Sequence, residues 1–200
     1  MSRAVLWDLG HTLVDWDPRR VYRSLLSDDA AVEQFLGGVC TMAWHTEHDR
    51  GVPMAENREH LIAKYPHYED AIRAWETGLD GMLNGSVPGT DIVMDTLAER
   101  GVPQYALTNL PAEWVEPVNT LYPQMAHMKD VIVSAHEGVI KPDRRIYEIT
   151  AMRLPFAPEE VVFFDDRENN VTAAREFGFD AEVFRGEGPL KAALAARGLL

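Results

Sequence analysis

Four short apolar runs, each followed by a reactive polar residue, constrain the fold of this chain more than any other feature. The runs and the residues that end them are 4–7 before Asp8, 105–107 before Thr108, 138–140 before Lys141, and 161–164 before Asp165 and Asp166. A short apolar run between polar residues is typical of a strand buried on both faces, as in a parallel sheet. Ligands of open parallel sheets bind outside the carboxyl ends of the strands. We therefore expect these polar side chains to meet at one edge of a sheet, with Lys141 brought there by the loop before a helix.

The carboxylates at this edge predict a site for an anion held by a divalent metal. Asp8 leaves a buried strand for a glycine-containing turn, so its carboxylate can attack phosphorus and form an aspartyl-phosphate intermediate. A carboxylate that approaches a phosphate needs its charge offset. Mg²⁺ suits this role because carboxylates, phosphate oxygens and water bind it. Asp165 and Asp166 would supply its remaining protein ligands.

Three further residues at the edge would bind the phosphate. Thr108 and Asn109 would hydrogen-bond the phosphoryl oxygens, and Lys141 would stabilise negative charge in the transition state. Considered alone, each residue has a simpler explanation: Asp8 could form a turn, and the acidic pair at 165–166 could lead a helix. The combination favours a functional site. Otherwise four independent strand ends would each have to resemble a part of the same site, in the right order along the chain, by chance.

Alternating helix and strand patterns from residue 90 onward predict βαβ units and a parallel sheet. The expected strands are 102–107, 131–134, 161–164 and 181–184, and the expected helices are 91–100, 112–121, 142–152 and 170–177. Residues 18–36 are expected to form a helix, and 41–83 contain further helical segments without a period-2 strand pattern. The turn-forming residues 84–89 are expected to link back to the sheet. The helical block at 16–86 is therefore an insertion into an α/β core made of 1–15 and 87–200.

Composition excludes several classes of function. The chain has 200 residues, 46% of them hydrophobic, and a formal net charge of −13. This charge argues against nucleic acid as the main partner, because phosphate backbones require clustered Lys and Arg. It does not exclude a small phosphorylated substrate, since a bound metal can invert the local field. The single cysteine, Cys40, excludes an internal disulfide, and no apolar run approaches the length of a membrane span. We expect a cytoplasmic protein that binds neither membranes nor nucleic acid.

The same residues resemble the motifs of the haloacid dehalogenase-like (HAD) hydrolases, in the branch whose first motif is D-x-G. The stretches that carry the resemblance, in order, are 7–13 (WDLGHTL), 107–109 (LTN), 138–147 (GVIKPDRRIY) and 163–171 (FFDDRENNV). The resemblance implies a Rossmann-like α/β core with a small inserted α-helical cap, and Mg²⁺-dependent phosphoryl chemistry through Asp8. It also implies that Asp166 is the main metal ligand of the fourth motif, with Asp165 auxiliary. The Gly10 carbonyl would be a backbone ligand, and Asn170 would brace the metal loop or cap its helix.

One position departs from the family pattern. Most family phosphatases have a second Asp two residues after the nucleophile, which protonates the leaving group and later activates water. This chain has Gly10 there. Members similar to this chain are commonly assigned as sugar-phosphate phosphatases, so Gly10 does not exclude hydrolysis. His11 is the nearest replacement, because an imidazole titrates near neutrality. It could equally be a loop residue that points away, with a water or the cap serving instead.

Residues 41–51 lie where similar family members place cap residues that face the active site. At helical spacing Trp44 and His48 share a face. Trp44 could stack on a sugar ring, and His48 or Arg50 could bind a hydroxyl or a second anionic group. Alternatively, Trp44 belongs to the core of the cap and Arg50 pairs with a nearby acid.

These features favour a Mg²⁺-dependent phosphatase that hydrolyses a small phosphorylated metabolite, with a sugar phosphate as the expected substrate. The second possibility is a 2-haloacid dehalogenase, in which Asp8 attacks carbon. Dehalogenases also lack the second Asp, but metal-free carbon chemistry needs no acidic pair at 165–166. The third is a phosphate-binding protein that has lost turnover through Gly10. The expected catalytic residues are Asp8, Lys141, Thr108 and His11.

Overall fold

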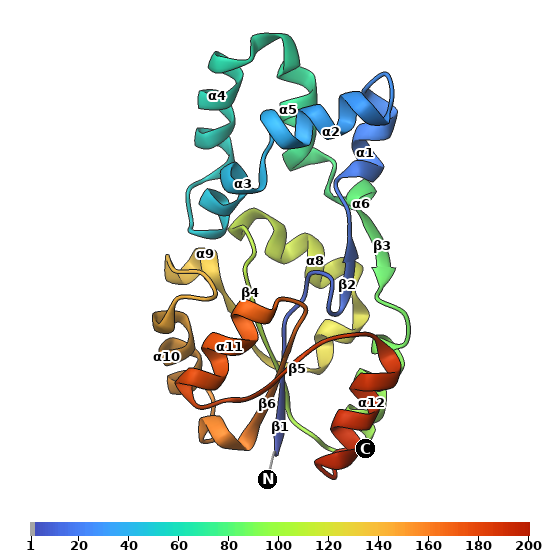
Figure 1. Cartoon of the computed structure of the whole chain (residues 1–200), viewed down its shortest axis with the longest axis vertical. Coiled ribbons are helices and arrows are strands. Elements are labelled where there is room, and N and C mark those ends of the chain that lie inside the picture. The colour runs from blue at the N-terminus through green and yellow to red at the C-terminus, as the bar shows by residue number, and fades with distance from the viewer. Residues whose placement is uncertain (1–2) are drawn as a thin grey trace.

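The chain folds into a parallel sheet with helices on both faces, as described by a computed structural model of residues 3–200 (Figure 1). Within these residues the five strands of the sheet lie in the order β5-β4-β1-β6-β7, and every neighbouring pair is parallel. The strands are β1 (Ala4–Trp7), β4 (Gln104–Thr108), β5 (Met128–Val133), β6 (Val161–Asp165) and β7 (Asp180–Val183). This topology confirms the α/β, Rossmann-like fold expected from the alternating pattern.

The remaining elements fall into two sets along the chain. The first set is α1 (Arg19–Leu25), α2 (Asp29–Gly38), α3 (Met42–Asp49), α4 (Met54–Lys64), α5 (Glu69–Thr77) and α6 (Leu79–Met82), flanked by the antiparallel strands β2 (Val14–Trp16) and β3 (Leu83–Ser86). The second set is α7 (Thr90–Glu99), α8 (Val115–Leu121), α9 (Ser134–Glu137), α10 (Arg144–Arg153), α11 (Glu168–Phe177) and α12 (Glu187–Ala196). Among residues 3–200, no helix combines the length and apolar character that a membrane span requires.

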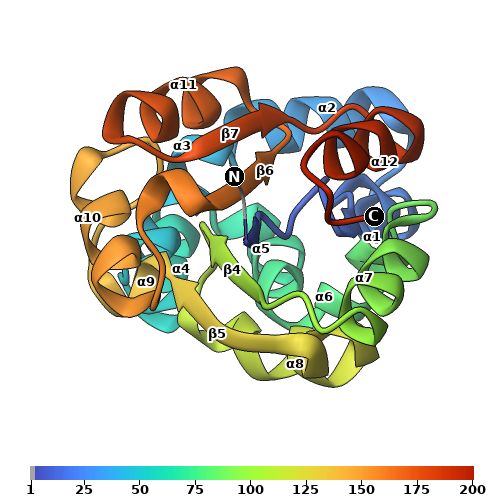
Figure 2. The same cartoon turned by 90° about the horizontal axis from the view of Figure 1, so that it is seen from below.

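The sheet strands are apolar throughout because helices cover both faces. Side chains alternate across the central strand β1. Val5 and Trp7 belong to a core cluster with α7, α8 and α12, whereas Ala4 and Leu6 pack in a second cluster with α10 and α11. Figure 2 shows these two groups of helices on opposite sides of the sheet. All four side chains of β1 are 0% exposed, which explains why its apolar run is unbroken.

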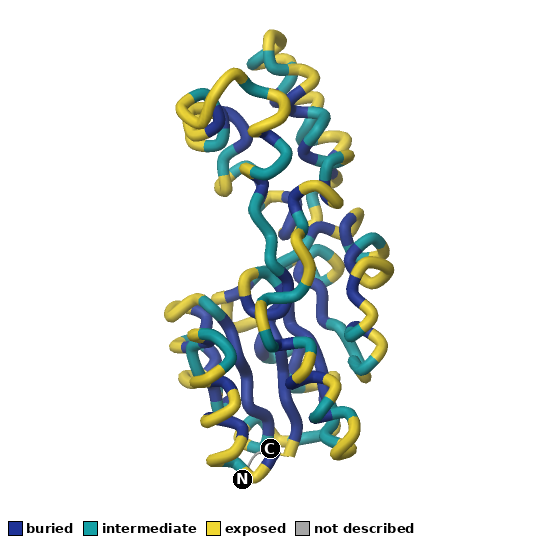
Figure 3. Tube along the Cα trace, turned by 90° about the vertical axis from the view of Figure 1, so that its right-hand side faces the viewer, coloured by how far each residue is buried: buried dark blue, intermediate teal, exposed yellow. Residues whose placement is uncertain are grey.

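Helices α1–α6 gather beyond the carboxyl ends of the sheet strands, and the β2–β3 pair connects them to the sheet (Figure 1). Figure 3 shows the buried trace of the sheet in the lower part and a smaller helical part above it, joined by a narrow waist. The helical part has an aromatic interior in which Tyr22, Phe35 and Trp75 are buried. These helices therefore cover the edge of the sheet at which the polar residues that follow the apolar runs lie.

Several elements differ from the sequence prediction. The pattern predicts one helix over 18–36, but the structure has two, because Asp28 caps a new helix by accepting a hydrogen bond from the Ala31 amide (2.9 Å). The predicted linker at 84–89 begins as strand β3, which pairs with β2. Neither short strand has enough residues to show a period in the sequence. Helix α12 follows the last predicted strand and was not expected.

Truncation of Leu6 tests how much the central strand contributes to stability. Leu6→Ala should lower the free energy of unfolding by ~2–5 kcal/mol, because the close-packed neighbours on both sides cannot collapse into the cavity. Leu25→Ala is the matched control, since Leu25 is 49% exposed, and should change stability by less than ~0.5 kcal/mol. Urea denaturation measures both values. Equal losses in the two variants would contradict the assignment of β1 to the core.

Candidate active site

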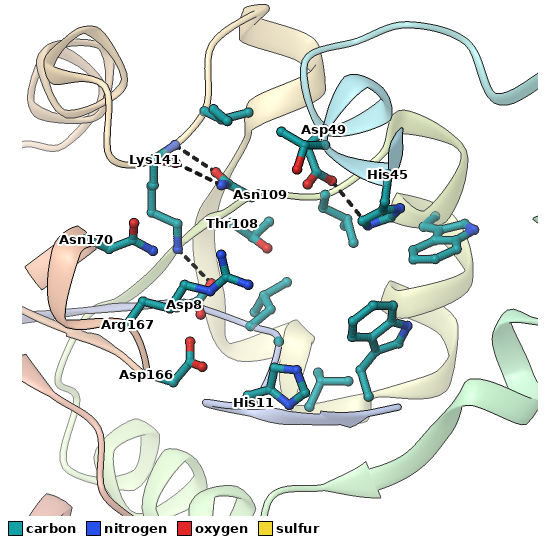
Figure 4. Close-up of a pocket in the computed structure, with 18 of the residues that line it drawn as sticks. Asp8, His11, His45, Asp49, Thr108, Asn109, Lys141, Asp166, Arg167 and Asn170 are labelled. Carbon is teal, nitrogen blue, oxygen red and sulfur yellow. Dashed lines mark hydrogen bonds and ion pairs between the residues drawn. The ribbon is translucent and has the colours of Figure 1, made fainter. Parts of the chain in front are cut away.

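A cavity of about 310 Å³ lies between the carboxyl edge of the sheet and helix α3 (Figure 4). The sequence-predicted residues that line it are Asp8, Gly10, His11, Thr108, Asn109, Lys141 and Asp166. Thr108 is the last residue of β4, and Asp8 follows β1 directly. The carboxyl ends of parallel strands meet at one edge, which is why residues up to 158 positions apart share this cavity.

The ammonium of Lys141 is the centre of the polar end of the cavity. Its Nζ donates hydrogen bonds to Asp8 Oδ1 and Asp165 Oδ2, both at 2.7 Å, and to the Leu107 carbonyl at 2.9 Å. Lys141 is 3% exposed, Asp8 7% and Asp165 0%. Burial lowers the pKa of Lys141, but the two carboxylates outweigh it and raise the pKa above its ordinary value. The lysine is therefore a fixed positive charge beside Asp8.

Asn109 holds the backbone of Lys141 in place. Its side-chain oxygen accepts a hydrogen bond from the Lys141 amide (2.8 Å), and its Nδ2 donates to the Lys141 carbonyl (3.1 Å). The sequence predicts that Asn109 binds phosphate, whereas its side chain is engaged by the main chain of Lys141. Asn109 thus positions the lysine.

The three carboxylates form a cluster suited to a hard cation. Asp8, Asp165 and Asp166 each offer an oxygen, and these atoms lie within 4.8 Å of one another. Burial raises the pKa of Asp8; Lys141 opposes this shift, while repulsion from Asp165 and Asp166 adds to it. Burial and the neighbouring Asp165 also raise the pKa of Asp166. One lysine does not balance this cluster, and an all-oxygen donor set with excess negative charge fits Mg²⁺.

Asp165 is the most completely engaged member of the cluster. Besides Lys141, it accepts hydrogen bonds from the Asn170 Nδ2 to both oxygens (3.0 Å) and from the Arg167 amide (2.9 Å). Asn170 therefore braces the loop after β6, as the resemblance implies. Asp166 lines the cavity and Asp165 does not, so Asp166 is the more accessible carboxylate of the pair.

The position that usually holds a second Asp is open. An ideal Cβ placed on Gly10 meets no heavy atom within 4 Å. The adjacent His11 has a left-handed backbone (φ 59°), lines the cavity and packs edge-on against Trp16 at 5.8 Å between ring centroids. His11 is an exposed residue. It faces the same space as Asp166 in Figure 4.

Helix α3 presents a different face to the cavity from the one expected. Trp44, His48 and Arg50 do not line it; the residues of α3 that do are Met42, His45, Thr46 and Asp49. Trp44 Nε1 donates to the Asn57 carbonyl (3.4 Å), and His48 Nε2 lies 2.9 Å from Asn57 Nδ2, so both rings pack against α4. Arg50 lies 3.7 Å from Glu47 at the surface. Helical spacing identifies residues that share a face but not which face meets the sheet. The contacts agree with the alternative in which Trp44 belongs to the core of the cap and Arg50 pairs with a nearby acid.

His45 and Asp49 form a buried pair that the sequence reasoning missed. Asp49 is 6% and His45 5% exposed, and His45 Nε2 lies 3.6 Å from Asp49 Oδ1 (Figure 4). Burial raises the pKa of Asp49 to about 7; Arg167 and Lys141 oppose the shift. Arg167, which also lines the cavity, follows the acidic pair directly, so its place within the fourth motif could have indicated it.

Much of the remaining lining of the cavity is apolar and aromatic. It includes Leu9, Val14, Trp16, Met42, Leu79, Leu83, Leu110, Trp114 and Val118. Trp16 and Trp114 both contact the ring of His45, with centroids 5.8 Å and 5.2 Å away. Their buried indole nitrogens lack hydrogen-bond partners among the described residues. The cavity thus has a charged end and a largely apolar end.

This fold and this arrangement of motifs define a class of hydrolase. The chain belongs to the haloacid dehalogenase-like hydrolases, whose family model matches residues 3–178. It is 25% identical over 179 residues to sesquiterpene phosphatase astK from Aspergillus oryzae, and the matched region covers 88% of this chain and 86% of that protein.

Solved structures of the same fold include enzymes of two kinds. A HAD family enzyme from Bacteroides thetaiotaomicron, in complex with magnesium and inorganic phosphate, superposes with a TM-score of 0.71 at 18% identity, covering 93% of this chain and 96% of that one. L-2-haloacid dehalogenase from Xanthobacter autotrophicus, with chloropropionic acid covalently bound, superposes with a TM-score of 0.67 at 18% identity, covering 100% and 85%. At these identities the likeness shows the fold.

Removal of the Lys141 charge should destabilise the protein. In the absence of added Mg²⁺, Lys141→Met should lower the free energy of unfolding by ~3–5 kcal/mol, because Asp8 and Asp165 are then left buried without a cation. Lys191→Met is the matched control, since the Lys191 side chain is 48% exposed in its pair with Glu187, and should cost less than ~1 kcal/mol. Urea denaturation measures both. Similar losses of unfolding free energy in the two variants would show that the buried lysine does not stabilise the buried carboxylates.

Asp49→Asn should stabilise the protein in a pH-dependent way. Burial raises the pKa of Asp49 from its ordinary 3.8 to about 7, so its contribution to stability is full below pH ~4 and is lost as the pH rises through ~7. Asn does not ionise. The variant should therefore match wild type near pH 4 and exceed it by on the order of 1–4 kcal/mol at pH 8. Unfolding followed by circular dichroism across this range tests the prediction, with Glu47→Gln, an exposed acid of the same helix, as a control that shows no such divergence.

Proposed function

We propose that this chain is a Mg²⁺-dependent phosphatase that hydrolyses a small phosphorylated metabolite through an aspartyl-phosphate on Asp8. The observation that carries the proposal is the buried cluster in which Asp8 lies beside the Lys141 ammonium and two further carboxylates, at the charged end of a cavity. A nucleophilic carboxylate, a fixed cation and a hard-metal donor set are the parts that phosphoryl transfer to Asp requires.

Each residue of the charged end has a role in this reaction. An oxygen of Asp8 attacks phosphorus, and Lys141 balances the negative charge of the phosphoryl group. The Thr108 hydroxyl and the Asn109 main chain hydrogen-bond the phosphoryl oxygens. Mg²⁺, held by Asp8, Asp165, Asp166 and the Gly10 carbonyl, would offset the charge between the attacking carboxylate and the phosphate.

We also infer that residues 16–86 act as a cap on a core formed by 1–15 and 87–200. The α1–α6 helices cover the carboxyl edge of the sheet, and α3 contributes one wall of the cavity. Such a cover excludes water from the reacting phosphoryl group and strengthens its electrostatic interactions.

The cavity lining favours an organic group that is less polar than the sugar expected from the sequence. Beyond the charged end it is lined by Trp16, Trp114, Leu79, Leu83 and Val118, which offer few partners for the hydroxyls of a sugar. A phosphomonoester with a hydrocarbon-rich group would bury that group against these side chains. The similarity to a sesquiterpene phosphatase supports the same substrate class.

Phosphate release from a substrate panel tests the proposal. The panel contains a prenyl monophosphate, sugar phosphates and p-nitrophenyl phosphate, each assayed with Mg²⁺ and with EDTA. Wild type should release phosphate only with Mg²⁺, and most efficiently from the prenyl monophosphate. Asp8→Asn should reduce kcat by at least ~10³-fold because the nucleophile is lost, whereas Asp70→Asn, at an exposed acid of α5, should leave it unchanged.

Two other outcomes would identify the competing functions. Halide release from 2-haloacids that persists in EDTA would favour a dehalogenase, for which the open position at Gly10 is the favourable observation. Phosphate binding in the presence of Mg²⁺ without turnover of any substrate would favour a phosphate-binding protein.

A further inference from the structure

Phosphoester hydrolysis through Asp8 needs a proton donor for the leaving oxygen, and the carboxylate that usually provides it is absent from the first motif, where Gly10 stands. The Gly10 position is open space, and the three carboxylates around Lys141 form the cation-binding cluster. We propose that Asp49, on helix α3, is the general acid and base of this reaction. The inference rests on the phosphatase function proposed above.

The position of Asp49 is the first observation that supports this role. It is a lining residue of the same cavity as Asp8 while only 6% exposed. In Figure 4 its carboxyl group lies across the open space from Asp8, on the cap side. The leaving oxygen of a phosphoester departs on the side opposite the attacking nucleophile, because the two oxygens lie roughly in line through phosphorus. Asp49 therefore lies on the side where a proton is needed.

The hydrogen bonding of Asp49 leaves it free to act. Its buried Oδ1 has no hydrogen-bond partner among the described residues. Buried carboxyl oxygens are normally satisfied, whereas His45 Nε2 lies 3.6 Å from this oxygen, beyond hydrogen-bond distance. The carboxyl group of Asp49, which lines the cavity, is therefore not fully bonded within the protein and can bind the leaving oxygen of the substrate or the water that replaces it.

His45 positions Asp49 and does not supply the proton itself. Trp75 Nε1 donates a hydrogen bond to His45 Nδ1 (3.1 Å), so the single proton of the neutral imidazole is on Nε2, which faces Asp49 Oδ1 at 3.6 Å. Burial lowers the pKa of His45 to about 3, and His48 adds to this shift. His45 is therefore neutral at physiological pH, and its N–H points at Asp49.

The electrostatic surroundings of Asp49 suit a carboxyl group that gives a proton in one step and takes one in the next. The charged groups that act on Asp49 are Arg167, Lys141 and Arg50, which lower its pKa, and Asp8, which raises it. Burial outweighs them and raises the pKa to about 7. A carboxyl group with a pKa near the working pH can give a proton in one step and take one in the next.

In the proposed reaction Asp49 gives a proton in the first step and takes one in the second. As Asp8 forms its bond to phosphorus, the phosphorus–oxygen bond of the ester breaks and the Asp49 proton passes to the departing oxygen, which leaves as an alcohol. Asp49, now a carboxylate, takes a proton from water while the water oxygen bonds to phosphorus and the bond to Asp8 breaks. Inorganic phosphate leaves and Asp49 is again protonated.

A comparison of leaving groups separates this role from a structural one. p-Nitrophenol leaves readily without protonation, whereas a simple alcohol does not. In Asp49→Asn, kcat for an alkyl monophosphate should fall by ~10²–10⁴-fold. With p-nitrophenyl phosphate, the first equivalent of nitrophenol should appear in a burst at a near wild-type rate, followed by slow turnover, because hydrolysis of the aspartyl-phosphate still lacks its base. The phosphorylated enzyme should accumulate and be detectable by mass spectrometry.

Matched variants serve as controls. Glu47→Gln alters an exposed acid of the same helix and should behave as wild type with both substrates. His11→Gln alters the competing candidate and should not show the burst. Calorimetric titration with inorganic phosphate and Mg²⁺ should show that Asp49→Asn still binds phosphate, which separates lost proton transfer from lost structure.

Three results would overturn the proposal. One is an equal loss with both substrates in Asp49→Asn without accumulation of phosphorylated enzyme. Another is a change confined to KM, which would assign Asp49 to substrate binding. The third is that His11→Gln shows the pattern predicted for Asp49→Asn, namely a large fall in kcat with an alkyl monophosphate and a nitrophenol burst with p-nitrophenyl phosphate. Absence of turnover in wild type would instead reject the phosphatase function, so the two failures are distinguishable.

Discussion

The ion pair network around Lys141 is the interaction on which the rest of the site depends. A buried ammonium contacts Asp8, which directly follows β1, Asp165 at the end of β6 and the carbonyl of Leu107 in β4. Three neighbouring strands thus converge on one nitrogen, and the desolvation of each charge is offset by the others. The parallel register of β4, β1 and β6 is what brings these groups together, so the fold and the chemistry have a common origin at this edge.

Much of the fold and of the charged end of the site could be predicted from the sequence. Strands covered on both faces leave unbroken apolar runs, and the carboxyl ends of parallel strands share one edge. Asp8, Thr108 and Asp166 could therefore be assigned to one cavity without coordinates. Lys141 could be added only through its loop before a helix, because residues 138–140 form no strand in the structure. The position of Asp165 followed from the same reasoning, although its role as a hydrogen-bonded anchor for Asn170 appears only in the structure.

The cap wall of the cavity could not be predicted in the same way. Trp44 and His48 share one face of α3, while His45 and Asp49 share the next, and both faces carry similar residue types. The choice between them depends on helix packing: Trp44 and His48 contact α4 through Asn57, which turns His45 and Asp49 toward the sheet. Such contacts join residues of different helices, so a local pattern does not contain them. The β2–β3 pair, which sets how the helices meet the sheet, is also too short to recognise.

An acid on the cap has a physical advantage over one beside the nucleophile. A fourth carboxylate at position 10 would add its charge to a cluster that already raises the pKa of Asp8 and Asp166. Across the cavity, burial raises the pKa of Asp49, and Arg167 and Lys141 oppose the shift, so the proton donor lies outside the cluster that contains the nucleophile. In the proposed mechanism, proton transfer depends on helix α3, because this helix carries Asp49. Met42 and Thr46 of the same helix line the cavity, so the helix that would contact the organic group of the substrate would also carry the proton that releases it.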